Sequence, residues 1–152
     1  KYMLQMATDQ FSGGEKMGML EHFMNALASY QTQHFHAEEL ARGEVWGSFL
    51  LRDKTIDIAN IIPGSLHHIC KPYDQVRILQ TLDSIGALVY SKSRRDRKTS
   101  VRIQSHVTSC YQIQVGVIRR YLEDQQSERD RADAQALLDK AAERLQAKEG
   151  FA

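Results

Sequence analysis

The side chains best suited to chemistry lie in a short basic run at residues 92–98. The run contains five cationic residues and one carboxylate, namely Lys92, Arg94, Arg95, Asp96, Arg97 and Lys98. The surrounding segment 71–102 has eight Lys or Arg against three Asp or Glu, whereas 1–70 and 103–152 are mildly acidic. A chain needs such a division when one of its surfaces meets phosphate groups and the rest must avoid them. A solvated, mobile surface loop rich in arginine is the alternative interpretation.

A second candidate site is a group of metal-ligating residue types, His34 and His36 with Glu38 and Glu39 nearby. Imidazole and carboxylate groups can supply ligands for zinc. Residues i and i+2 of a helix point about 200° apart, however, so the two imidazoles would not face one ion. We therefore expect a surface or dimer-interface histidine pair and no metal site.

The two cysteines, Cys70 and Cys110, lack the CxxC spacing of zinc and redox motifs, so we expect both to be reduced and buried. Cys110 could act as an oxidation sensor if its thiolate were stabilised, but its apolar neighbours favour an inert thiol. The sequence contains no GxGxxG, P-loop, GxSxG or HExxH motif. These observations disfavour an enzyme and predict no cofactor.

Composition sets the frame for these residues. The chain has 152 residues, of which 42% are hydrophobic and 26% are charged, as is typical of one globular domain over 1–152. No apolar run approaches the ~18 residues that a membrane span needs, and no secretory signal is visible. We expect a cytoplasmic protein that does not contact a membrane.

The first third of the chain is predicted to be helical from its apolar spacing. One helix should run from about 14 to about 41, with Ser12 and Glu15 as a capping box at its start. A second helix should cover 44–54. The following segment, 55–62, fits either a helix or a short strand.

The middle of the chain has a more specific pattern. Residues 65–70 predict a short helix, and apolar residues at three-residue intervals predict a second helix over 72–86, with Pro72 in its first turn and Gly86 at its C-cap. The apolar stripe of this second helix consists of Val76, Leu79, Leu82 and Ile85. Two helices joined by a short turn form a helix-turn-helix. A strand at 88–90, a charged loop at 92–98 and a returning strand at 99–103 should follow.

Two more helices are predicted at the end of the chain. A wide apolar face favours a helix from Ser105 to about Leu122. A narrow stripe within dense charge favours a last helix at about 126–148, and such a stripe suits packing on a partner helix. The stripe consists of Ala134, Leu137, Leu138, Ala141 and Leu145.

This order of elements is that of a winged helix, and the sequence resembles the MarR family of bacterial regulators. The resemblance rests on the run from Leu82 to Val89, with its Gly86, on the Arg94-Arg95-Asp96-Arg97-Lys98 loop, and on Pro72–Leu82, which has Pro at its start and Arg five residues before Leu. It implies a mostly α fold with a small β-wing: a winged helix-turn-helix over 44–105 with N- and C-terminal dimerisation helices at 14–43 and 106–148. The chain departs from the family at Tyr73-Asp74-Gln75 and at His67-His68, so no operator sequence can be transferred.

The predicted DNA contacts divide into two groups. The helix 72–86 should lie in a major groove and present the polar residues off its apolar stripe, Tyr73, Asp74, Gln75, Arg77 and Thr81, to bases and phosphates. An ordinary amphipathic helix is the alternative. The resemblance implies that Arg97 enters the minor groove and that Asp96 orients neighbouring arginines by a charge-assisted hydrogen bond. Lys92, Arg94, Arg95 and Lys98 would then contact phosphates.

The resulting hypothesis is a homodimeric, ligand-responsive transcriptional repressor that binds a pseudo-palindromic operator in double-stranded DNA, with its recognition helices in successive major grooves. The resemblance also implies a small aromatic or thioester effector, and the candidate pocket walls are Tyr30, Trp46, Phe49 and Tyr111. Core packing is the alternative role for each of these four residues. The alternative function is a winged-helix protein-interaction module whose basic loop binds an acidic partner without specific DNA binding.

Overall fold

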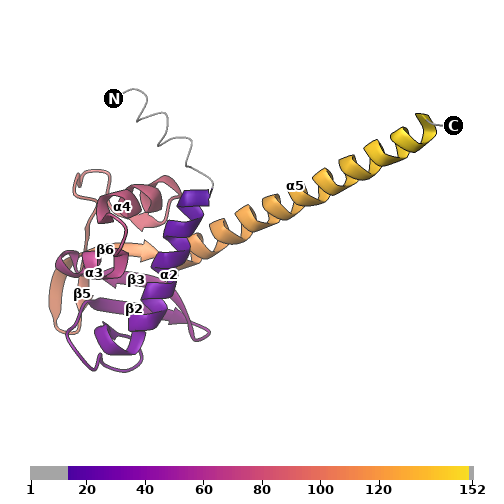
Figure 1. The fold of residues 1–152 in the computed structure, drawn as a ribbon. Helices are drawn as coiled ribbons and strands as arrows, with labels where there is room; N and C mark the ends of the chain where they lie inside the picture. Colours follow the sequence, from indigo (N-terminus) through magenta and orange to yellow (C-terminus); the bar gives the residue numbers. More distant parts are fainter. Residues whose placement is uncertain (1–13, 151–152) are drawn as a thin grey trace.

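A computed structural model describes residues 14–150 of the chain (Figure 1). Its helices are α2 (Gly14–His34), α3 (Leu66–Cys70), α4 (Gln75–Ser84) and α5 (Val115–Gly150), with a 3-10 turn η1 at Pro63–Ser65. Its strands are β1 (Phe35–His36), β2 (Gly47–Arg52), β3 (Thr55–Ile61), β4 (Leu88–Val89), β5 (Thr99–Ile103) and β6 (His106–Gln114).

The centre of the fold is a six-stranded mixed sheet. Five strands follow the order β1-β2-β3-β6-β4, and β5 pairs with β6. The pairing is antiparallel except between β1 and β2, which are parallel. The prediction of a mostly α winged helix with a small β-wing is therefore wrong, because two segments predicted as helices are strands of this sheet.

The first of these segments is 44–54, which forms β2 and the turn into β3. Asp53 and Lys54 both have positive φ, 52° and 64°, as a two-residue type I′ hairpin turn requires. Gly47 begins β2 where a Cβ atom would lie 1.8 Å from the Asn60 carbonyl oxygen, so the close approach to β3 requires glycine. Apolar residues three and four apart suggested a helix here, but pairing with β3 decides the conformation. The ambiguous segment 55–62 is the partner strand.

The second segment is 105–114, which forms β6 instead of the start of a helix. Gln104 has φ 56° in the tight turn after β5, so Ile103 faces His106 and the chain turns back on itself. The β-branched and aromatic residues of β6 suit a strand that has neighbours on both sides, β3 and β4. The helix predicted from Ser105 begins only at Val115 and continues without a break through the predicted last helix, as α5.

The helix α2 ends at His34 and not near residue 41. Phe35 is 1% exposed, its ring stacks on Phe49 with centroids 4.1 Å apart, and its backbone pairs with Gly47. This buried strand residue ends the helix. The apolar face of α2, formed by Met17, Met19, Leu20, Phe23 and Leu27, is buried within the chain itself. The predicted capping residue Ser12 lies outside the described residues.

The two central helices are present, with shifted bounds. Pro72 follows a cis peptide bond before α4, whose N-cap is Asp74: its side chain accepts a hydrogen bond from the Val76 N–H at 3.3 Å. At the other end, the Ala87 N–H bonds the Leu82 carbonyl and the Gly86 N–H bonds the Asp83 carbonyl, a Schellman motif. Gly86 has φ +77°, so its predicted role at the helix end is confirmed.

The helix α5 leaves the sheet and extends away from the rest of the protein (Figure 1). Val115 and Ile118 are buried in the core, whereas nearly every residue from Glu123 to Ala147 is exposed. At 1.5 Å per residue the whole helix is about 54 Å long. No helix of the described residues is both long and apolar enough to cross a membrane.

Candidate nucleic-acid interface

The basic run lies in a loop that interrupts the pairing along β6. Val89 of β4 pairs with Gln112, and Thr99 of β5 pairs with Cys110. Residues 90–98, which we call the basic loop, therefore connect β4 to β5. The residues of β6 that pair with Val89 and Thr99 are separated only by Tyr111. The predicted loop is present, but 99–103 does not return along 88–90, because both strands pair with β6.

Hydrogen bonds hold the basic loop in one shape. Arg94 donates from Nε and Nη2 to the two carboxylate oxygens of Asp96, at 3.2 and 3.0 Å, and from Nη2 to Ser109 Oγ on β6 at 3.0 Å. Asp96 also accepts from the Lys98 backbone N–H at 3.1 Å. These bonds lower the pKa of Asp96, and the bonds to Arg94 are the largest cause. The expected charge-assisted hydrogen bond between Asp96 and a neighbouring arginine is thus present.

An ion pair joins the basic loop to α4. Arg97, with φ 60°, places its Nε 3.3 Å from Asp83 Oδ2 near the end of α4. The other oxygen of Asp83 accepts a 2.9 Å hydrogen bond from the Tyr90 hydroxyl, which raises the pKa of Tyr90. The basic loop and α4 therefore form one surface. Arg97 itself is committed to Asp83, so in this structure it joins the two elements and does not project freely toward a groove.

The outer face of α4 differs from the one predicted by its three-residue intervals. The buried residues are Ile78, Leu79, Thr81 and Leu82, whereas Val76 is 50% exposed. Thr81 cannot reach a base because it is 6% exposed and its hydroxyl donates to the Arg77 carbonyl.

The other predicted readers occupy varied positions. Arg77 is 43% exposed and forms a 2.9 Å ion pair with Glu15 of α2. Asp74 caps α4, and the amide oxygen of Gln75 is buried without a hydrogen-bond partner among the described residues. The ring of Tyr73 lies 5.3 Å from that of His22 in an edge-on arrangement. Of the five predicted readers, only Asp74 and Arg77 are charged, and both are engaged within the chain, Asp74 as the N-cap of α4 and Arg77 by Glu15.

Two residues of the outer face were missed by the sequence reasoning. Val76 and Gln80 are exposed and lie one turn apart on α4. A valine methyl group can contact the thymine methyl, and a glutamine amide can pair with adenine. Both were missed because Val76 was assigned to the buried apolar stripe, which placed the predicted outer face on the wrong side of the helix. The sequence of the helix also fits a buried stripe through Ile78 and Leu82.

The free positive charge of this surface is concentrated in a few side chains. Lys92 and Arg95 are exposed on the basic loop, and neither forms an ion pair with any described residue. Lys98 places its ammonium group 5.7 Å from the centre of the Tyr111 ring. Lys71 before α4 and Arg102 on β5 are further exposed cations that the sequence reasoning did not single out. These groups can bind phosphates without first breaking an ion pair.

The four aromatic residues expected to line an effector pocket do not come together around a cavity. Trp46 and Phe49 are 7% and 4% exposed and belong to the core. Trp46 is stacked between His34 at 3.6 Å and His68 at 4.9 Å, with Tyr30 at its edge. Tyr111 lies on β6 beside the basic loop, and burial raises its pKa. Core packing, the alternative considered for each residue, describes Trp46 and Phe49.

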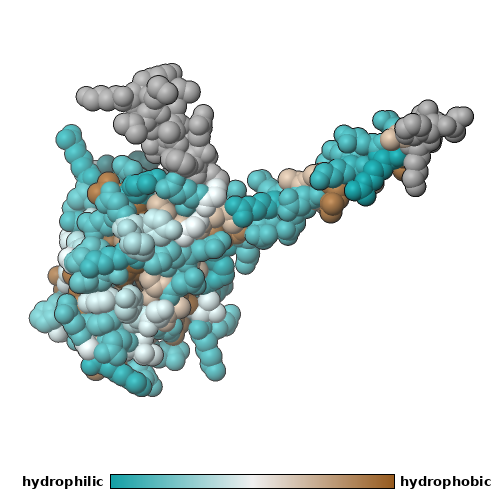
Figure 2. Space-filling view, viewed as in Figure 1, coloured by the Kyte–Doolittle hydropathy of each residue, from teal (hydrophilic) through white to brown (hydrophobic). Residues whose placement is uncertain are grey.

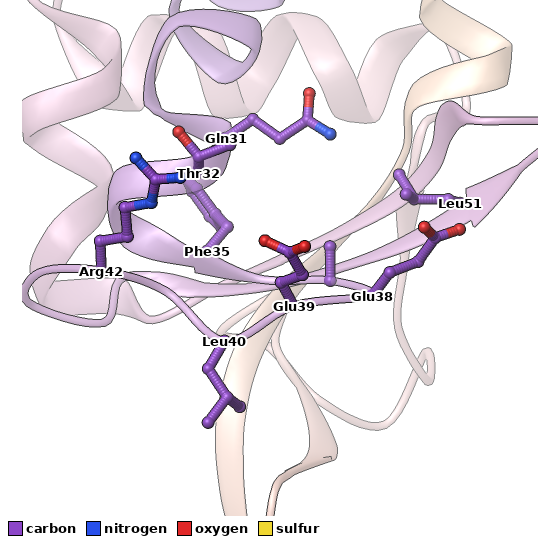
Figure 3. A pocket seen from close by; sticks show the side chains of 9 residues that line it. Gln31, Thr32, Phe35, Glu38, Glu39, Leu40, Arg42 and Leu51 are labelled. Atoms are coloured by element: carbon purple, nitrogen blue, oxygen red, sulfur yellow. The ribbon is translucent and has the colours of Figure 1, made fainter.

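A pocket of about 170 Å³ lies elsewhere, at the end of α2 (Figure 3). It lies beside Phe35 and Leu51, with the carboxylates of Glu38 and Glu39 and the guanidinium of Arg42 around it. None of the expected aromatic walls lines this pocket.

The histidines and cysteines have structural surroundings. His34 Nδ1 lies 2.7 Å from the Glu44 carbonyl oxygen, and His36 Nδ1 accepts the Ala41 N–H at 2.9 Å. Within residues 14–150 no group of three metal-ligating side chains is close enough to hold an ion. Burial raises the pKa of Cys70 to about 12, with a contribution from Asp74, and burial also raises the pKa of Cys110. Both cysteines are free and buried, so the expected burial is confirmed.

A scan of the chain against known protein families gives no match, and a search of curated proteins finds none similar to it. The resemblance to the MarR family is supported by neither comparison.

Proposed function

We propose that this protein binds double-stranded DNA, with α4 in the major groove and the basic loop on the phosphate backbone beside it. The observation that carries the proposal is the ion pair between Arg97 and Asp83, which makes the basic loop and the outer face of α4 one continuous surface. A major groove about 12 Å wide admits a single α-helix, and phosphates flank it on both sides.

The roles of the residues follow from their exposure and pairing. Lys92, Arg95 and Lys98 would neutralise phosphates, since these cations are not engaged by carboxylates. Val76 and Gln80 are the candidates for base contacts, because they are exposed on the outer face of α4, whereas Arg77 would first have to leave Glu15. Phosphate contacts supply affinity for any sequence, and only base contacts distinguish one sequence from another.

Arg97 and Asp96 would act by positioning. Asp96 holds Arg94 in place, and Arg97 fixes the distance between the basic loop and α4. An exposed ion pair contributes only about 0–1 kcal/mol to stability, so these contacts shape the surface more than they stabilise the fold. Transcriptional repression, the role that the MarR resemblance implies, requires the sequence-specific binding proposed here.

Selection from a random pool of duplexes tests this function. The full chain is used to enrich bound sequences, and binding of the selected duplex and of a scrambled one is then compared by fluorescence anisotropy. We expect the selected duplex to bind at least about tenfold more tightly, a difference that one good base contact provides. Equal binding of the two duplexes would contradict sequence readout and favour the alternative, a module whose basic surface binds an acidic protein.

A further inference from the structure

The exposed half of α5 carries an apolar stripe that nothing in the described structure covers. Leu137, Leu138 and Leu145 are 69%, 65% and 62% exposed. Together with Ala134 and Ala141 they lie on one side of the helix, at spacings of three, four and seven residues. Figure 2 shows apolar residues among hydrophilic ones on this projecting arm. We refer to residues 123–147 as the arm.

We infer that the arm binds the arm of a second copy of this chain, in antiparallel orientation, as a two-stranded coiled coil. The sizes of the core residues support this orientation. Along the positions that would face a partner, Ala134, Leu138, Ala141 and Leu145 alternate between small and large. In an antiparallel pair with its two-fold axis between residues 139 and 140, each leucine packs against an alanine of the other arm.

In a parallel pair each residue of the stripe would face the same residue of the partner arm. Leu138 would face the partner's Leu138, and Ala141 would face the partner's Ala141, so the helices would have to be far apart in one layer and close in the next. Alternating large and small residues across facing positions instead fills the interface at one helix separation, about 8–10 Å.

This dimer differs from one with recognition helices in successive major grooves. If the arms pair about residues 139 and 140, the two positions where α5 leaves the core, near Leu122, are about 52 Å apart along the helices. Major grooves on one face of DNA repeat about every 34 Å. The inferred dimer does not depend on DNA binding, and it is tested without DNA.

Sedimentation of the full chain tests whether the arm forms a dimer. We expect a dimer at micromolar to submillimolar concentrations and at least about a tenfold rise in its dissociation constant for Leu138→Glu, which would bury an unpaired charge. Ala136→Glu is the matched control, because Ala136 lies on the opposite side of the arm and should leave the dimer intact. Because Leu138 and Ala136 are both exposed in this structure, both variants should keep the wild-type circular dichroism spectrum. A monomeric wild-type chain, or equal effects of the two variants, would overturn the inference.

The orientation is tested by pulsed electron paramagnetic resonance on Ser127→Cys carrying a spin label. Ser127 is exposed, whereas the native Cys70 and Cys110 are buried and should not be labelled. Each label lies about 19 Å from the inferred two-fold axis, so the two labels should be about 38 Å apart along the helices. A separation near the ~10 Å spacing of neighbouring helices would show a parallel pair and overturn the antiparallel assignment.

Discussion

Replacing Arg95 by alanine should weaken DNA binding in a way that depends on salt. Arg95 is exposed at the tip of the basic loop and forms no ion pair or hydrogen bond with any described residue, so its removal leaves the loop's internal contacts in place. The free energy of unfolding should therefore stay within about 0.5 kcal/mol of the wild-type value.

The size of the effect follows from counterion release. Each phosphate contact makes the negative slope of log K against log salt steeper by about 0.9. At 0.1 M salt one lost contact then costs about 0.9 log units, or roughly eightfold and 1.2 kcal/mol. At 0.3 M salt the same loss is only about threefold.

Fluorescence anisotropy with selected and scrambled duplexes over this salt range measures the slope directly. Arg52→Ala is the matched control, since Arg52 is also exposed but lies on β2, separated from β6 by β3. We expect Arg95→Ala to weaken both duplexes equally and to reduce the slope by about one, and Arg52→Ala to change neither. A slope unchanged by Arg95→Ala, or lowered equally by Arg52→Ala, would refute the assignment of the basic loop to phosphate binding.

Three further predictions concern α4 and the residues that position the interface. Gly86→Ala should destabilise the protein by about 1–2 kcal/mol in chemical denaturation, because alanine disfavours the φ of +77° at this position, whereas Gly64→Ala, with open space and no positive φ, should not. Asp96 has a lowered pKa, so its contribution to loop order should be present at pH values above its unfolded pKa near 3.9 and lost as the pH falls through the lower folded pKa. We expect the NMR resonance of the Arg94 Nε–H to disappear in acid and to be missing at every pH in Asp96→Asn. A resonance that persists in Asp96→Asn would contradict this prediction. Cys70, with its pKa raised to about 12, should resist alkylation at pH 8 until the chain unfolds, and fast labelling of the native protein would show that the thiol is not buried.

The parts of the fold predicted correctly from the sequence are those determined by local signals. Gly86 ends α4 because its backbone conformation disfavours other residues, and the charge of 92–98 keeps that segment out of the core. The short helix predicted at 65–70 is present as α3 (Leu66–Cys70).

The strands β2 and β6 were missed because their conformation depends on distant partners. Ala59 of β3 pairs with Phe49 on β2 and with Ile113 on β6, and no local pattern in the sequence indicates these contacts. Apolar residues spaced by three and four fit a helix in both segments. The turn Asp53-Lys54, which lacks glycine, and Gln104-Ser105 are weak hairpin signals, so the sheet could not be inferred from its turns.

For the candidate interface, residue types were predicted better than orientations. The cluster of cations and the Asp96 hydrogen bond follow from composition and proximity in sequence. The partners of Arg97 and Arg77, namely Asp83 and Glu15, lie 14 and 62 residues away along the chain, and only the folded structure brings them into contact. These pairings separate the free cations from the engaged ones.

Chemical-shift mapping of the full chain with a selected duplex tests the proposed interface most directly. In ¹H–¹⁵N spectra we expect the largest perturbations at the exposed positions of α4, including Val76 and Gln80, and throughout residues 91–98, with little change in the β2–β3 hairpin. Perturbations centred on that hairpin or on the arm, with α4 and the basic loop unaffected, would contradict the proposal that this surface binds DNA.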